Sequence, residues 1–150
     1  MTGSAADSLL ARATALLARR EHSEHELSLK LTQKGHPLGE IRAVLADLKV
    51  HGLLSDERFT ESLVNSRRER GYGPLRISQD LRSKGVAQEL IERWVDVNDP
   101  QWLDVLRMTW TKKFGGDAPE SYKEWARQAR FLQSRGFTSE QIRKIVDLDD

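Results

Sequence analysis

The chain has 150 residues, of which 38% are hydrophobic and 31% charged, and its 24 basic and 23 acidic residues leave a net charge of +1. This polar composition is typical of thin helical proteins with much surface per residue, and the near-neutral charge does not by itself indicate a nucleic-acid-binding protein. Cysteine is absent and no apolar run has membrane-spanning length, so we exclude a disulfide framework, a thiol nucleophile and a membrane protein and expect a soluble cytoplasmic one.

Three copies of one pattern organise the chain, and each copy predicts three helices. The first copy follows an expected disordered lead-in (1–6) and begins with a helix at about 7–20. The second copy begins with a helix at about 55–70 and the third with a helix at 101–114. Each of these helices has apolar residues at helical spacing along one side, which predicts that it packs against the rest of its copy.

The two later helices of each copy share a signature. In 31–45, 81–95 and 132–146, a leucine stands four residues before a glycine, a lysine or arginine directly before it, and an isoleucine six residues after it. Glycine after a helix that ends in a cation is typical of a helix stop, and the apolar spacing beyond it predicts another helix. Because each bundle is too small to bury a large core alone, we expect an all-α fold in which three tandem three-helix-bundle repeats form an elongated, curved array: 7–52, 53–98 and 99–150.

No constellation for catalysis is present, so we expect no enzyme. The chain has no phosphate-binding loop and no dinucleotide-binding glycine motif after a strand. His22 and His25 are close in sequence, but Ser23 between them fits a helix cap, and no cysteine completes a zinc site. We interpret the histidines as solvated turn residues and expect neither a metal nor a cofactor.

The first candidate binding segment is basic and surrounds "RRERGYGPLR" (67–76). Residues 66–84 hold six basic against two acidic side chains. The end of one helix and the start of the next explain Gly71 and Pro74. They do not explain the number of arginines, because one cation would complement the negative end of the helix adequately. Guanidinium groups bind phosphates and carboxylates through paired hydrogen bonds, whereas the ring of Tyr72 is expected to pack on the turn more than to stack on a base. The candidates here are Arg67, Arg68, Arg70, Tyr72, Arg76, Arg82 and Lys84.

A second basic segment covers 107–135, with seven basic against three acidic side chains. Within it, Lys123, Arg127 and Arg130 follow one another at i, i+4 and i+7, which predicts that they share the exposed face of a helix. We therefore add these three residues to the candidates. The four tryptophans fall within apolar helix patterns and are interpreted as core.

Three blocks of this sequence resemble the bacterial RecX regulatory proteins: "REHSEHEL" (20–27), "GLLSDERFTESLVNSRRERGYGPLRISQDLRSKGV" (52–86) and "RQARFLQSRGFTSEQI" (127–142). The resemblance covers about 9–147, with the three repeats in register. It implies a non-catalytic, cytoplasmic modulator that binds the filament of the RecA recombinase on single-stranded DNA and restrains filament growth, ATP hydrolysis and strand exchange. It also implies a role of the basic face for the four arginines of the middle block. We expect a monomer, with direct DNA binding weakened by the near-neutral charge.

A sequence-specific DNA-binding regulator is the alternative, because three-helix units joined by tight turns also resemble helix-turn-helix modules. A recognition helix needs base-reading side chains at its exposed N-terminal end. The candidate helices begin with "PLGEIR", "AQELIE" and "SEQIRK", in which acidic residues come early. This argues against entry into a DNA groove.

Overall fold

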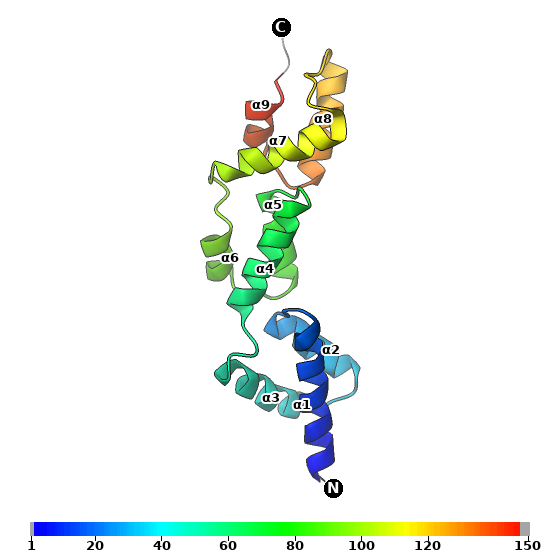
Figure 1. The fold of residues 1–150 in the computed structure, drawn as a ribbon, viewed down its shortest axis with the longest axis vertical. Coiled ribbons are helices and arrows are strands. Elements are labelled where there is room, and N and C mark those ends of the chain that lie inside the picture. Colours follow the sequence, from blue (N-terminus) through cyan, green and yellow to red (C-terminus); the bar gives the residue numbers. More distant parts are fainter. Residues whose placement is uncertain (1, 148–150) are drawn as a thin grey trace.

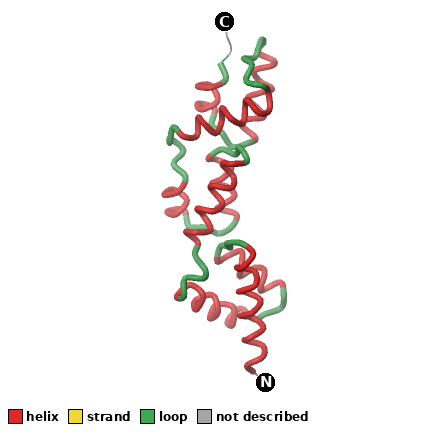
Figure 2. Tube along the Cα trace, in the orientation of Figure 1, coloured by secondary structure: helices red, strands yellow, loops and turns green. Residues whose placement is uncertain are grey.

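The computed structural model describes residues 2–147, with side chains from residue 8 onward. Within this part of the chain, helices are joined by loops and turns and there is no strand (Figures 1 and 2). Repeat 1 contains α1 (Thr2–Arg19), α2 (Glu24–Gln33) and α3 (Leu38–Val50). Repeat 2 contains α4 (Asp56–Glu69), α5 (Pro74–Ser83) and α6 (Gln88–Trp94), and repeat 3 contains α7 (Gln101–Phe114), α8 (Tyr122–Ser134) and α9 (Ser139–Ile145). The repeats follow one another along a rod, so the prediction of an elongated all-α array is confirmed.

The N-terminal end of α1 differs from the sequence-based expectation. The backbone of residues 2–6 is the first part of this helix, where a disordered lead-in is expected. The segment has no proline and contains two alanines, which are the best helix formers, so nothing in it stops the helix from extending. Met1 lies outside the described residues.

Side-chain caps fix the starts of several helices. Ser23, Ser55 and Ser121 each accept a hydrogen bond from the backbone N–H three residues later. Thr138 forms the complete reciprocal capping box with Gln141, as its spacing predicts. Because such caps satisfy N–H groups that have no partner within the helix, they define the starts of α2, α4, α8 and α9.

Each repeat has its own hydrophobic core. Ile41 and Leu45 contribute to the core of repeat 1, Ile77 and Leu81 to that of repeat 2. Trp102, from the start of α7, is only 1% exposed and belongs to the core of repeat 2, so one side chain joins two repeats. The other three tryptophans are half-buried, and the prediction that all four are core residues is met fully only by Trp102.

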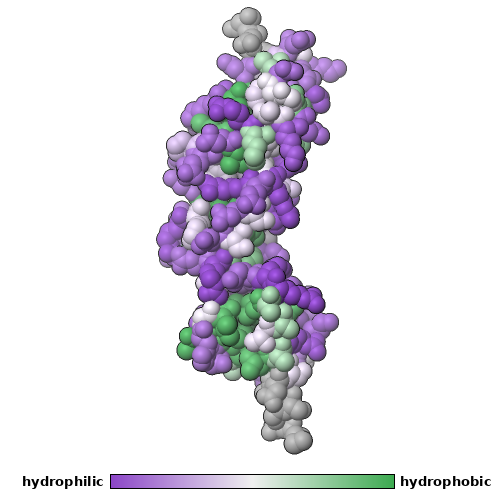
Figure 3. All heavy atoms as spheres, in the orientation of Figure 1, coloured by the Kyte–Doolittle hydropathy of each residue, from purple (hydrophilic) through white to green (hydrophobic). Residues whose placement is uncertain are grey.

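The closest helix packing occurs within the repeats, where each helix lies against its two neighbours. The repeats therefore meet through turns and helix ends. Over the residues that the structure describes, no helix is long and apolar enough to cross a membrane. The face in Figure 3 is mostly polar over repeats 2 and 3 and carries an apolar patch over repeat 1. Large exposed apolar side chains of repeat 1 are Leu10, Leu29, Leu38 and Val50, and Leu53 follows directly in the link to repeat 2.

Candidate functional site

The "RRERGYGPLR" turn lies at the junction of repeats 2 and 3. Its backbone meets the turn after α8: Gly73 N–H donates to the Arg135 carbonyl at 2.7 Å, and Leu75 N–H donates to the Gly136 carbonyl at 2.9 Å. A Cβ on Gly73 would lie 2.6 Å from that Gly136 carbonyl oxygen. The glycine is therefore needed for the close approach of the two turns. The sequence does not reveal this role, because the partner residue Arg135 is 62 residues further along the chain.

Two of the candidate arginines share one carboxylate. Arg67 Nε lies 3.3 Å from Asp80 Oδ2 and Arg76 Nε lies 3.6 Å from Asp80 Oδ1. All three side chains are partly exposed, and such pairs contribute little stability. The pairing nevertheless offsets part of the positive charge that these arginines present to an anion.

The remaining candidates of this segment also have partners inside the protein, with one exception. Arg68 donates to Gln101 Oε1 at 3.0 Å and lies over the Trp102 ring. Arg82 donates to Gln88 Oε1 at 3.1 Å, and Lys84 pairs with Glu26 at 3.1 Å. The exception is Arg70, whose side chain is exposed and has no ion pair among the described residues.

The ring of Tyr72 is half-buried and packs in the turn. The guanidinium carbons of Arg76 and Arg135 lie 5.2 Å and 4.9 Å from its centre. Cations over an aromatic ring are favourable, and here they come from two different repeats. The tyrosine therefore helps to join repeats 2 and 3 and is not an open platform for a base.

A basic hollow of about 280 Å³ opens beside this turn, where α4, α7 and α8 end. Arg70, Lys112, Lys113 and Arg135 line it, together with a single carboxylate, that of Glu69. The apolar part of its lining comes from Met108 and Phe131. We call this hollow, between repeats 2 and 3, the junction hollow. Arg135 belongs to the repeat signature, yet only the fold brings it to the other cations.

A second hollow, of about 370 Å³, lies between repeats 1 and 2 and shares Arg70 with the junction hollow. Arg20, Arg67 and Lys84 line it, opposed by two glutamates. The two hollows together present seven basic and three acidic side chains. Because charges act over about 8–10 Å at ordinary ionic strength, this side of the rod is locally positive in a nearly neutral chain.

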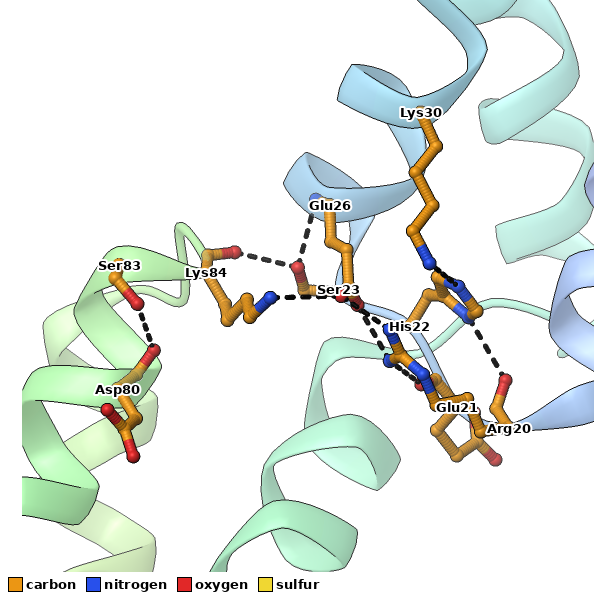
Figure 4. Close-up of polar contacts among 9 residues, drawn as sticks. All are labelled: Arg20, Glu21, His22, Ser23, Glu26, Lys30, Asp80, Ser83 and Lys84. Carbon is orange, nitrogen blue, oxygen red and sulfur yellow. Dashed lines mark hydrogen bonds and ion pairs between the residues drawn. The ribbon is translucent and has the colours of Figure 1, made fainter.

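The junction of repeats 1 and 2 is held by a network around Glu26, whose side chain is 6% exposed (Figure 4). Its carboxylate accepts from Arg20 at 2.7 and 3.0 Å and from Lys84 Nζ at 3.1 Å. Burial alone would raise the pKa of Glu26, but the hydrogen bonds from Arg20 and Lys84 outweigh it and lower the pKa to about 2. Ser23 Oγ accepts the cap bond from Glu26 N–H at 3.0 Å and donates to the Lys84 carbonyl at 2.7 Å.

His22 is buried next to this network, which corrects the expectation of solvated turn histidines. It is 1% exposed, with Nδ1 3.1 Å from the Arg20 carbonyl and Nε2 2.9 Å from Lys30 Nζ. Burial, together with the charges of Arg20 and Lys30, lowers the pKa of His22. A neutral ring donates at Nδ1 and accepts from the ammonium at Nε2, so this histidine has a structural role. No group of three or more potential ligand side chains in residues 8–147 is placed to hold a metal ion.

The second predicted face lies on α8. Lys123, Arg127 and Arg130 are all exposed. Arg127 makes two hydrogen bonds to Glu124, at 2.6 and 3.0 Å, which lower the pKa of Glu124 and raise that of Arg127. Lys123 and Arg130 have no ion pair among the described residues, so they are the more accessible cations of this face.

Three tandem three-helix bundles place this chain in the class of helical repeat proteins. Family models for the first, second and third three-helix domains of RecX match residues 10–48, 55–93 and 99–146. The regulatory protein RecX of Halorhodospira halophila is 44% identical over 148 residues, which are 99% of this chain and 92% of that protein. The protein of the same name from Pseudomonas syringae is 41% identical over a stretch that covers 87% of this chain and 84% of that protein. This chain belongs to the RecX regulatory protein family.

Solved structures agree with this assignment at the level of the fold. The crystal structure of RecX from Lactobacillus salivarius superposes with a TM-score of 0.78, covers 96% of both chains and is 19% identical. A second crystal structure of a regulatory protein RecX superposes with a TM-score of 0.80 at 20% identity. The superposition covers 97% of this chain and 75% of the chain in that structure. The arrangement of three bundles thus persists where most side chains differ.

Proposed function

We propose that this protein binds the RecA–single-stranded DNA filament and inhibits recombinase activity, namely filament growth, ATP hydrolysis and strand exchange, without catalysing a reaction itself. The observation that carries the proposal is the match of all three repeats to the RecX family. We further propose that it acts in the cytoplasm as a monomer. The elongated shape favours an extended binding partner, because a rod presents its binding surfaces in a line (Figure 1).

Contacts at several points along the rod are the proposed source of inhibition. The two basic hollows and the exposed face of α8 offer attachment to acidic protein surface or DNA phosphates. When one contact is made, the others act at high effective concentration, so individually weak contacts suffice. A rod attached across neighbouring recombinase subunits would block the addition of further subunits or favour dissociation.

The candidate residues differ in what they offer such a partner. Arg70, Lys123 and Arg130 are exposed without an ion pair among the described residues, and they are the proposed primary contacts. Arg67 and Arg76 must first be released from Asp80. We therefore propose that direct binding to free single-stranded DNA is weak and that the filament is the preferred partner.

The test is the ATPase rate of preformed recombinase filaments on single-stranded DNA, measured with increasing amounts of this protein. We expect the rate to fall at sub-stoichiometric ratios, and an unchanged rate at every ratio would contradict the proposal. Replacing Arg70, Lys123 and Arg130 by glutamate should weaken inhibition while circular dichroism shows unchanged helicity. Analytical ultracentrifugation tests the monomer.

A further inference from the structure

We propose that the junction hollow binds an acidic peptide segment that carries one bulky apolar side chain. The hollow would thus recognise a protein component of the filament and not the DNA strand. The idea depends on the proposed function only for the identity of the protein that supplies the segment. Its physical basis is the combination of a positive rim, an apolar floor and the absence of an open aromatic face.

The rim carries more positive charge than the helix ends require. Arg70, Lys112 with Lys113, and Arg135 lie at the C-terminal ends of α4, α7 and α8 respectively. Each helix end corresponds to about half a negative charge, so three ends leave part of the four cationic charges uncompensated even with Glu69 beside them. Carboxylates of a peptide satisfy such a rim through charge-assisted hydrogen bonds.

The floor favours one apolar side chain. Met108 is 47% exposed on α7 and lines the hollow. It is the accessible apolar side chain of the lining, because cations lie over the ring of Phe131. Methionine is flexible and polarizable, so it adapts to varied apolar partners. Pockets for small-molecule ligands usually measure about 300–1,000 Å³, and the junction hollow, at about 280 Å³, is suited to a side chain more than to a cofactor.

Single-stranded DNA fits this hollow less well. Proteins that bind it without sequence preference stack bases on exposed aromatic rings. Here Lys113 Nζ and the Arg135 guanidinium already lie 5.2 and 5.0 Å from the centre of the Phe131 ring, and Phe114 packs edge-on against it at 5.5 Å. A DNA strand would find cations for its phosphates but no free ring for its bases.

Hydrogen bonds between the repeats hold the hollow in shape. Arg135 Nη1 donates to the Arg70 carbonyl at 3.2 Å, and Thr109 Oγ1 lies 3.0 Å from the Gly71 carbonyl. A methyl group on Gly71 would come within 2.5 Å of that threonine oxygen, so the two elements are in close contact. A preformed site loses less conformational entropy on binding.

Fluorescence anisotropy with a labelled ten-residue peptide of aspartate, glutamate and glycine residues and one central phenylalanine tests the proposal. The same peptide with alanine at the centre, and a ten-residue oligothymidylate, serve as comparison ligands. We expect the phenylalanine peptide to bind about tenfold more tightly than the alanine peptide, because burial of a large apolar side chain is worth at least that factor. Tighter binding of the oligothymidylate would overturn the proposal.

Variants localise the binding. Lys112→Gln with Lys113→Gln should weaken peptide binding about tenfold, in line with the loss of charge-assisted contacts. The control, Arg12→Gln with Arg42→Gln, makes the same change of charge at exposed positions of repeat 1 and should leave binding unchanged. Equal losses in the two double variants would show a general charge effect and refute the site.

Met108→Ser provides an independent test that leaves the rim intact. We expect it to remove the preference for phenylalanine over alanine, and a retained preference would contradict the proposed floor. Helicity and thermal melts verify that each variant is folded. If the filament ATPase is inhibited but the peptides do not bind, the hollow proposal fails alone; if the peptides bind but the ATPase is unaffected, the proposed function fails alone.

Discussion

Replacing Glu26 by glutamine tests the network that joins repeats 1 and 2. Glutamine keeps the size of the side chain but removes its charge and turns one acceptor into a donor that faces Arg20 or Lys84. Lowering the pKa from 4.5 to about 2 corresponds to about 3 kcal/mol. This free energy is an upper limit, because the side chains of Arg20 and Lys84 are 50% and 40% exposed and solvent screens their charges. We expect a loss of about 1–2 kcal/mol at pH 7.

The pH dependence of this loss has a defined direction. The pKa of Glu26 is lower in the folded chain than in the unfolded chain, so its stabilisation is complete above about pH 5 and disappears as the pH falls towards 2. Urea unfolding of the wild-type protein and the variant should therefore show a difference at pH 7 that narrows at pH 3.

The matched control is Glu140→Gln, which removes an exposed carboxylate paired with Lys144 at 3.5 Å. We expect it to change stability by less than about 0.5 kcal/mol, as is usual for surface pairs. If Glu26→Gln costs no more than this control, or if its effect does not change with pH, the network does not stabilise the junction. In that case the efficiency of fluorescence energy transfer between dyes on repeats 1 and 3 would also be the same in the Glu26→Gln variant as in the wild-type protein.

Three further predictions follow from the other contacts. Gly73→Ala should destabilise repeats 2 and 3 by about 1–3 kcal/mol in urea unfolding, because its Cβ would lie 2.6 Å from Gly136. Gly39→Ala, a helical position with nothing within 4 Å, should stabilise by about 0.5–1 kcal/mol; the opposite order would refute the role of close approach. Trp102→Ala should cost about 3–5 kcal/mol and shift the melting of repeats 2 and 3 together, whereas a shift in repeat 3 alone would show that the tryptophan does not couple them. His22 should titrate below its ordinary pKa in NMR spectra, so that stability falls as the pH is lowered through about 6.5; an unshifted titration would contradict its burial.

The helices and the repeats could be predicted because their signals are local. A glycine after a terminal cation stops a helix wherever the chain goes next, and apolar spacing marks the side that packs. The start of α7 at Gln101 and its end at Phe114 agree with the predicted helix at 101–114. The serine and threonine caps were recognisable for the same reason, since a cap involves residues only three positions apart.

The contacts between repeats could not be predicted in the same way. The surplus of arginines in the middle block suggested binding, yet Asp80 pairs with two of them and Gln101 accepts from a third. The Arg76–Asp80 pair spans one helical turn and is local. The partners of Arg67 and Arg68 are thirteen or more residues away, and no local pattern identifies them. The junction hollow depends likewise on three helix ends that meet only in the fold.

The two junctions between the repeats are built from different kinds of contact. Repeats 2 and 3 share Trp102 and two backbone hydrogen bonds, through Gly73 and Leu75. Repeat 1 is attached to repeat 2 through charged and hydroxyl side chains, those around Glu26 and the Arg58–Glu21 pair, and through the close approach of Gly85 to His25. We therefore expect acid or high salt, which weaken ion pairs, to loosen the junction of repeats 1 and 2 before that of repeats 2 and 3.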